Sequence, residues 1–176
     1  MDIFFNYDYR GKEMQEFPLE ELARYVLVDE DMPQESCCCV TFVDNDEMTS
    51  LNEHYRGKTG PTDVLSFEAE GVGGDFDFDW PDDPEDIEEL ELGDIIIAPD
   101  VAEEQCSDFN MTFEGEVSLL LVHGLLHLCG YDHIEDEDAR VMQAREVDLL
   151  SAWAAAHPNV APPDYELNLE TVVGEH

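Results

Sequence analysis

Three histidines in the sequence have the spacing needed to bind one metal ion. His123 and His127 are four residues apart, and His133 follows six residues later. On an α-helix, residues four apart lie about 40° apart around the axis and about 6 Å apart along it. The first two rings can therefore point at one ion, whereas a continued helix would carry the third roughly 240° further around the axis.

The helix must therefore end soon after His127 if the third histidine is to reach the same ion. Gly130 is placed to end it, because glycine accepts the left-handed backbone that terminates helices. The chain can then turn and bring His133 back toward the first two rings. This arrangement favours a metal site over the alternative of unrelated polar residues at a helix end.

Three imidazoles suit zinc, which binds histidine nitrogen at about 2.0–2.1 Å and is commonly four-coordinate. Three protein ligands leave one position for water, as in catalytic rather than structural zinc sites. Zinc can lower the pKa of bound water from about 15.7 to about 7, which provides hydroxide at neutral pH. The spacing therefore predicts a hydrolytic zinc centre.

The residue after the first histidine separates this motif from that of the metzincin zinc proteases. Those proteases share the H-x-x-x-H-x-x-G-x-x-H spacing and place a glutamate directly after the first histidine, as general base for peptide hydrolysis. Here that position is Gly124, whose side chain cannot accept a proton. The motif thus predicts a zinc site without the base of a protease.

Three segments of the chain resemble, in order, the YbeY family of bacterial endoribonucleases. They are Y-R-G-K-T-G-P-T-D-V-L-S-F at 55–67, L-G-D-I-I-I-A at 92–98 and H-G-L-L-H-L-C-G-Y-D-H at 123–133. The resemblance covers about residues 40–150. It implies one zinc ion per chain with His123, His127 and His133 as ligands. It also implies a role in ribosomal RNA maturation, notably at the 16S rRNA 3′ end, and in ribosome quality control.

Two basic residues lie in the first of these segments. Arg56 and Lys58 are two of only seven lysines and arginines, and an ordinary surface turn is an equal interpretation from spacing alone. The resemblance gives Arg56 a role in catalysis, and we expect Arg56 and Lys58 to bind the substrate. Arginine suits a phosphate because its guanidinium donates two parallel hydrogen bonds, while lysine adds a point charge. Asp63 is predicted either to orient the loop or to pair with Arg56.

The overall charge restricts how the chain can meet RNA. Its 45 acidic and 7 basic residues give a formal net charge of −38. Such a charge repels nucleic acid over most of the surface, whereas RNA binding usually gains from Lys and Arg contacts to phosphates. We therefore expect a small basic patch helped by the metal. The resemblance implies ribosomal RNA and ribosome or assembly proteins as partners, and DNA is not expected.

The sequence predicts a cytoplasmic protein. The N-terminus lacks a secretory signal, and no stretch approaches the ~20 apolar residues of a membrane span. Cys37, Cys38 and Cys39 are consecutive, which fits neither a C-x-x-C knuckle nor a disulfide framework. We therefore expect reduced thiols. Cys129, beside the metal motif, is either a further ligand or, as we prefer, a packing residue.

The resemblance implies a single α+β domain over residues 1–155. Together with the periodicity of the sequence, it predicts a small mixed sheet of about four strands packed against about five helices. The zinc site is expected at the end of a central helix. Residues 68–91 are predicted as a long acidic mobile loop, and 156–176 as a peripheral or disordered tail. Strands are expected at 2–6, 37–43, 64–67 and 92–98. One helix is expected to begin at 18, a second to run from about 46 to 57, and a third from 99 to about 107. A fourth should begin at about 114, and a last helix should follow His133 and end at about 155.

The helix expected to begin near Glu114 carries the first two histidines and is apolar nearly all round, which predicts a central position. Asp132 is predicted to hydrogen-bond the outer nitrogen of a ligand histidine and fix its tautomer. Glu146, in the last helix, is expected either to form a hydrogen bond within the core or to lie at its rim.

These features together predict a single-strand-type endoribonuclease that hydrolyses phosphodiesters with the help of zinc. No residue of the sequence emerges as a general base. Two alternatives share the metal motif: a zinc peptidase or amidase, and a non-catalytic ribosome-assembly factor with a structural zinc. Gly124 counts against the first alternative, and the open coordination position expected from three protein ligands counts against the second.

Overall fold

The computed structural model describes residues 1–69, 90–108, 111–132 and 135–165. In this part of the chain the elements are β1 (Asp2–Asn6), α1 (Gly11–Glu16), α2 (Leu19–Asp29), β2 (Ser36–Phe42), α3 (Asn45–Arg56), β3 (Val64–Glu68), β4 (Leu90–Ile97), α4 (Pro99–Asp108), α5 (Phe113–Leu128) and α6 (Asp136–Ala154). The predicted α+β class with one small mixed sheet is confirmed. The short helix α1 is additional to the helices that the sequence predicted.

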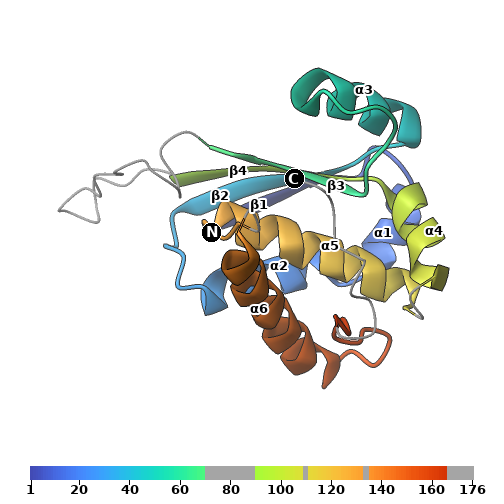
Figure 1. Cartoon of the computed structure of the whole chain (residues 1–176). Coiled ribbons are helices and arrows are strands. Elements are labelled where there is room, and N and C mark those ends of the chain that lie inside the picture. The colour runs from blue at the N-terminus through green and yellow to red at the C-terminus, as the bar shows by residue number, and fades with distance from the viewer. Residues whose placement is uncertain (70–89, 109–110, 133–134, 166–176) are drawn as a thin grey trace.

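The four strands form one sheet in the order β1-β2-β4-β3. β1, β2 and β4 are parallel, while β3 pairs antiparallel with the edge of β4. α3 lies on one face of the sheet, and α2, α5 and α6 lie on the other (Figure 1). β2 and the C-terminal half of β4 are largely buried between the two helical layers, whereas Glu91 and Asp94 of β4 are exposed.

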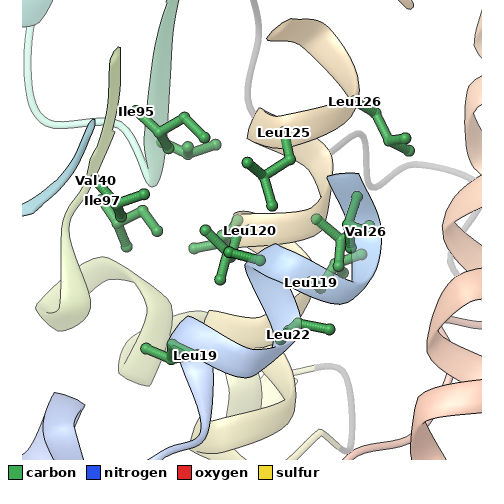
Figure 2. Close-up of a cluster of buried hydrophobic side chains, with 14 of the residues drawn as sticks. Leu19, Leu22, Val26, Val40, Ile95, Ile97, Leu119, Leu120, Leu125 and Leu126 are labelled. Atoms are coloured by element: carbon green, nitrogen blue, oxygen red, sulfur yellow. The ribbon is translucent and has the colours of Figure 1, made fainter. Parts of the chain in front are cut away.

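α5 is the central helix of the larger layer, as its apolar sequence predicted. Every residue from Gly115 to Leu128 is buried. Thr112 begins the helix by accepting a hydrogen bond from the Gly115 amide at 2.9 Å. Figure 2 shows α5 side chains packed between α2 and the sheet, with labels on Leu19, Leu22, Val26, Val40, Ile95, Ile97, Leu119, Leu120, Leu125 and Leu126. Burying each such leucine contributes roughly 1.5–3 kcal/mol, so α5 is a firmly held support.

α3 covers the opposite face of the sheet through a smaller apolar cluster around Met48 and Leu65. Asp44 caps the start of this helix, because its carboxylate accepts a hydrogen bond from the Glu47 amide at 2.8 Å. The helix ends at Gly57, which has a φ of 67°. A glycine there accepts the left-handed conformation without a steric cost.

Both ends of the segment predicted as a mobile loop are strands instead. Glu68 is the last residue of β3 and pairs with Gly93, while Leu90 begins β4 opposite Ser36. The backbone hydrogen bonds of the sheet outweigh the acidic composition that suggested a loop at these positions. The remainder of that prediction, residues 70–89, lies outside the described residues.

The described part of the predicted C-terminal tail packs on the domain. Val160 is buried, and the Asn159 carbonyl accepts a hydrogen bond from the hydroxyl of Thr112. The Tyr165 hydroxyl donates a hydrogen bond to Glu146 of α6. Residues 156–165 therefore belong to the folded unit. The rest of the predicted tail, 166–176, is outside the described residues.

A membrane-spanning segment was not expected from the sequence. In the four ranges that the structure describes, none of the helices combines the length and the apolar character that crossing a bilayer requires.

Gly93 lies at an irregularity in the pairing of β2 with β4, where the register shifts between Cys37 and Cys38. Its φ is 137°. A Cβ atom at this position would overlap the backbone oxygen of Phe67 and lie 2.9 Å from Cδ2 of Leu128. Only glycine allows β3, β4 and the end of α5 to approach one another here.

We predict that Gly93→Ala lowers the free energy of unfolding by roughly 3 kcal/mol, because it adds both backbone strain and overlap with a neighbouring strand. Gly57→Ala is the matched control, since Gly57 also has a positive φ but nothing lies within 4 Å of its added Cβ. Its cost should be about 1 kcal/mol. Urea denaturation of both variants measures the difference, and equal costs would contradict the packing argument.

Candidate metal centre

The structure brings two of the three predicted metal ligands together. His123 and His127 lie on the last two turns of α5 and are only 4% and 7% exposed. Their rings are nearly perpendicular, with centroids 4.6 Å apart and an interplanar angle of 84°. The two Nε2 atoms are 3.1 Å apart. The four-residue spacing on a helix therefore directs both nitrogens at one point.

The outer nitrogen of each ring has its own hydrogen-bond partner. Nδ1 of His127 lies 3.0 Å from the backbone oxygen of Tyr131. A carbonyl oxygen only accepts hydrogen bonds, so Nδ1 is the donor. Nδ1 of His123 lies 2.6 Å from Oε1 of Glu146, and a carboxylate likewise accepts. In a neutral ring the remaining nitrogen, Nε2, then carries a lone pair instead of a proton.

Two lone pairs that face each other in a buried site repel unless a positive charge lies between them. A proton or a metal ion can supply that charge. Two nitrogens bound to a tetrahedral zinc at about 2.0–2.1 Å would lie about 3.3 Å apart, close to the observed 3.1 Å. His123 and His127 thus fit a metal ion both in tautomer and in separation.

The third predicted ligand, His133, lies outside the described residues. Within the part of the chain that is described, no group of three or more His, Cys, Asp or Glu side chains forms a metal-ligand cluster. The described residues therefore supply two candidate ligands, and the role of His133 stays a prediction.

The predicted end of the helix is present. Gly130 has a φ of 103°, and its amide donates to the backbone oxygen of His127 at 3.0 Å. The Tyr131 amide donates to the backbone oxygen of Leu126, also at 3.0 Å. These bonds satisfy carbonyls of the last helical turn while the chain changes direction. The same turn places the Tyr131 carbonyl oxygen within hydrogen-bond distance of Nδ1 of His127.

Glu146 is a functional residue whose role the sequence left open. It is 1% exposed, so the core alternative is confirmed and the rim alternative is wrong. Its second oxygen accepts a hydrogen bond from the Tyr165 hydroxyl. The Nδ1 partners of His123 and His127 are Glu146 and a backbone carbonyl. The role predicted for Asp132 stays a prediction, because the third histidine lies outside the described residues. The sequence contained one indication of the core position of Glu146, because this residue lies on the same face of the last helix as its buried apolar residues.

Glu30 holds the surroundings of both rings together. Its carboxylate accepts a hydrogen bond from the Tyr131 hydroxyl at 2.9 Å. The same carboxylate forms an ion pair with Arg145, the residue before Glu146. Asp29 forms a second ion pair with Arg145. The C-terminal end of α2 thus fixes both the turn after α5 and the part of α6 that contacts His123.

Gly124 faces the sheet instead of the two rings. A Cβ at this position would lie 2.9 Å from Cγ2 of Ile95 in β4. A glutamate, as in the protease motif, would place a charged side chain against the apolar core. The packing of α5 on β4 therefore gives a structural reason for glycine at this position.

The two basic candidates lie at the end of α3. Arg56 is the last residue of that helix, and Lys58 follows in an exposed loop. Their helix packs on the face of the sheet opposite α5 (Figure 1). β3 connects the two regions, because a Cβ atom on Gly93 would meet both the Phe67 carbonyl oxygen of β3 and Cδ2 of Leu128 at the end of α5. The end of β3 is therefore close to the turn that precedes His133.

Comparison with known proteins identifies the family of the chain. A profile of the family described as Endoribonuclease YbeY matches residues 5–154. A protein named Endoribonuclease YbeY from Geobacillus thermodenitrificans is 42% identical over 136 residues, which cover 77% of this chain and 84% of the relative. The chain belongs to the YbeY family. The predicted resemblance is confirmed, and with it the prediction of an enzyme of the endoribonuclease class.

Two further proteins are similar to most of the chain. A protein named Endoribonuclease YbeY from Frankia casuarinae is 36% identical over 156 residues, covering 89% of this chain and 76% of its own. A solution structure from Thermotoga maritima has a TM-score of 0.55 and 27% identity, covering 92% of this chain and 97% of that one. Tyr165 lies beyond the residues that the family profile matches.

Asp63 orders the loop of the Y-R-G-K segment in this YbeY-family chain. It is 4% exposed, and its Oδ1 accepts hydrogen bonds from the Val64 amide at 2.8 Å and the Thr62 hydroxyl at 3.3 Å. Asn52 of α3 donates to the Gly60 carbonyl at 2.8 Å in the same loop. The first of the two predicted roles of Asp63, orienting the loop, is confirmed.

Cys129 has the properties of a packing residue. Its side chain packs against the main apolar core, and burial raises the pKa of its thiol to about 12. A thiol binds metals as the thiolate, which this environment disfavours. All five cysteines are free thiols, as predicted.

Glu116 is a second buried carboxyl group on α5, seven residues before His123. It is 3% exposed, and burial, followed by the negative charge of Asp63, raises its pKa from 4.5 to about 7. The Gln105 amide, oriented to satisfy both carboxyl groups, donates to Asp63 at 3.3 Å and to Glu116 at 3.2 Å. Glu116 therefore releases its proton near neutral pH.

We predict that Glu116→Gln makes the free energy of unfolding less sensitive to pH. A pKa raised in the folded state gives stability that is complete below pH 4.5 and lost as pH rises through about 7. The variant should therefore gain up to roughly 3 kcal/mol relative to the natural chain between pH 4.5 and pH 8. Denaturation at both pH values tests this, with the exposed Glu104→Gln as control. An unchanged pH profile in the Glu116 variant would contradict it.

Proposed function

We propose that this YbeY-family chain is a zinc-dependent endoribonuclease that cleaves single-stranded ribosomal RNA in the cytoplasm, with the 16S rRNA 3′ end and ribosome quality control as its context. The observation that carries the proposal is the pair of buried imidazole nitrogens 3.1 Å apart, each directed by a hydrogen bond on the other side of its ring. His123, His127 and His133 would hold the ion. When bound, zinc supplies a Lewis acid that polarises a phosphate oxygen and acidifies water.

The residues around the two rings orient them before substrate arrives. The Glu146 carboxylate accepts the Nδ1 proton of His123, and the Tyr131 carbonyl accepts that of His127. Both bonds hold the tautomer in which Nε2 is available to a cation. Burial of both rings limits water around them, which strengthens electrostatic interactions with a charged phosphate.

Arg56 and Lys58 would bind the phosphate. The guanidinium of Arg56 can donate two parallel hydrogen bonds to phosphate oxygens and neutralise the charge that develops on them during hydrolysis. Lys58 would add a point charge to the same region. This role is in keeping with their place beside a loop whose shape is fixed by buried Asp63.

The peptidase alternative has less support. Gly124 provides no carboxylate, and its position against Ile95 leaves no room for one. The alternative of an assembly factor with a structural zinc predicts a chain that keeps its metal but does not cleave RNA. The two experiments below separate metal binding from cleavage and therefore distinguish these functions.

We predict that Glu146→Ala weakens Zn²⁺ or Co²⁺ binding about 10–100-fold, because the orientation and basicity of the His123 ring depend on that carboxylate. Glu146→Gln keeps an acceptor oxygen and should lose less. Competition with a chelator measures the affinities, and the exposed Glu137→Ala on the same helix is the control. Equal metal affinities for the natural chain and Glu146→Ala would show that this carboxylate does not support metal binding.

We predict that a single-stranded oligoribonucleotide with the sequence of the 16S rRNA 3′ end is cleaved by the natural chain. His127→Ala should lose the metal and all detectable cleavage, since it removes a proposed ligand. Arg56→Ala should keep the metal and reduce kcat/KM about 100-fold, the usual effect of removing one charge-stabilising donor. Metal analysis and gel-based cleavage assays are run together. Cleavage that survives metal loss would overturn the proposed mechanism, and peptide turnover with intact RNA would favour the peptidase.

A further inference from the structure

Tyr55 is an unusually exposed aromatic residue. Among the described residues, the exposed large hydrophobic side chains are those of Phe4, Val28, Tyr55 and Val141, and Tyr55 has the largest exposed fraction, 60%. It lies in the last turn of α3, directly before Arg56. An exposed aromatic ring beside a phosphate-binding candidate is a feature that the proposed cleavage chemistry does not use.

Neighbouring rings hold Tyr55 in place. Its ring centroid is 4.5 Å from that of His54 at an interplanar angle of 89°. It is 5.2 Å from the Phe67 ring at 65°. Such edge-to-face contacts are favourable and restrict the ring, so little side-chain entropy would be lost when a ligand binds. The Tyr55 ring is thus exposed to solvent and is also held by its contact with Phe67 of β3.

The position of Tyr55 links the basic segment to the proposed metal centre. Phe67, which supports the ring, lies close to the end of α5, because a Cβ atom on Gly93 would meet both the Phe67 carbonyl oxygen and Cδ2 of Leu128. Asp132 belongs to the turn that leads from α5 toward His133. An extended RNA strand that lies along the β3 edge would therefore pass from Tyr55 toward that turn.

Stacking on an aromatic ring can contribute to RNA binding despite the strong negative charge of this chain. With a net charge of −38, binding that depends on phosphate contacts alone is opposed by the surface as a whole. A nucleobase stacked on an aromatic ring gains free energy that does not depend on the sign of the protein charge. One stacked base typically changes affinity roughly 5- to 150-fold.

We propose that Tyr55 is a stacking platform for one unpaired nucleobase of the RNA, next to the phosphate that Arg56 binds. This site rests on the proposed function, because it takes the same substrate. Since every base has an aromatic face, the platform selects single strands over paired ones without selecting a sequence. The phosphate contact and the base contact together define the ligand as an unpaired ribonucleotide segment.

The test combines substitutions of Tyr55 with an abasic substrate. Tyr55→Ala should raise KM for a single-stranded oligoribonucleotide about tenfold with little change in kcat, whereas Tyr55→Trp should keep or lower KM. A series of oligonucleotides, each with one abasic nucleotide, should contain one position where the abasic change raises KM in the natural chain but not in Tyr55→Ala. That loss of additivity identifies the stacked base.

Phe4→Ala is the matched control, because Phe4 is 56% exposed but lies on β1, at the opposite edge of the sheet. It should leave KM unchanged, and thermal unfolding should show that all variants fold. If the natural chain cleaves RNA and Tyr55→Ala has the same KM, or if every abasic effect is additive with it, the platform is wrong while the proposed function stands. If the natural chain neither binds nor cleaves RNA, the proposed function fails and the platform fails with it.

Discussion

The central constraint on this structure is the complete burial of α5. A helix that is apolar on every side must be enclosed, and here the sheet lies on one side of it and α2 and α6 on the others. Its two histidines are consequently removed from water along with their apolar neighbours. A buried imidazole requires partners for both nitrogens, and Glu146 and the Tyr131 carbonyl provide the outer ones. The inner nitrogens are left facing each other.

The parts of the site that the sequence predicted correctly depend on local spacing. His123 and His127 converge because they are one helical turn apart, and Gly130 ends the helix because its backbone can adopt a positive φ. Both effects act within a few residues, so periodicity and glycine chemistry are sufficient to predict them. The roles of Arg56 and Lys58 stay predictions, because spacing alone does not distinguish these residues from a surface turn.

The parts that the sequence did not predict depend on contacts between distant segments. Glu146 is 23 residues from His123, and Tyr165 is 19 residues further along the chain. Only the packing of α6 and the C-terminal segment on α5 brings them together. The strand ends at Glu68 and Leu90 were missed for a related reason, because sheet pairing can include residues whose own composition suggests a loop.

The ion pair between Glu30 and Arg145 has a consequence for the behaviour of the two imidazoles. Glu30 also binds the Tyr131 hydroxyl, so one carboxylate on α2 connects the neighbours of both rings. The rings are thus preorganised as a unit by a helix that contributes no ligand of its own. The entropic cost of orienting them is met when the chain folds, so the proposed metal ion would meet two nitrogen donors whose orientation is already fixed.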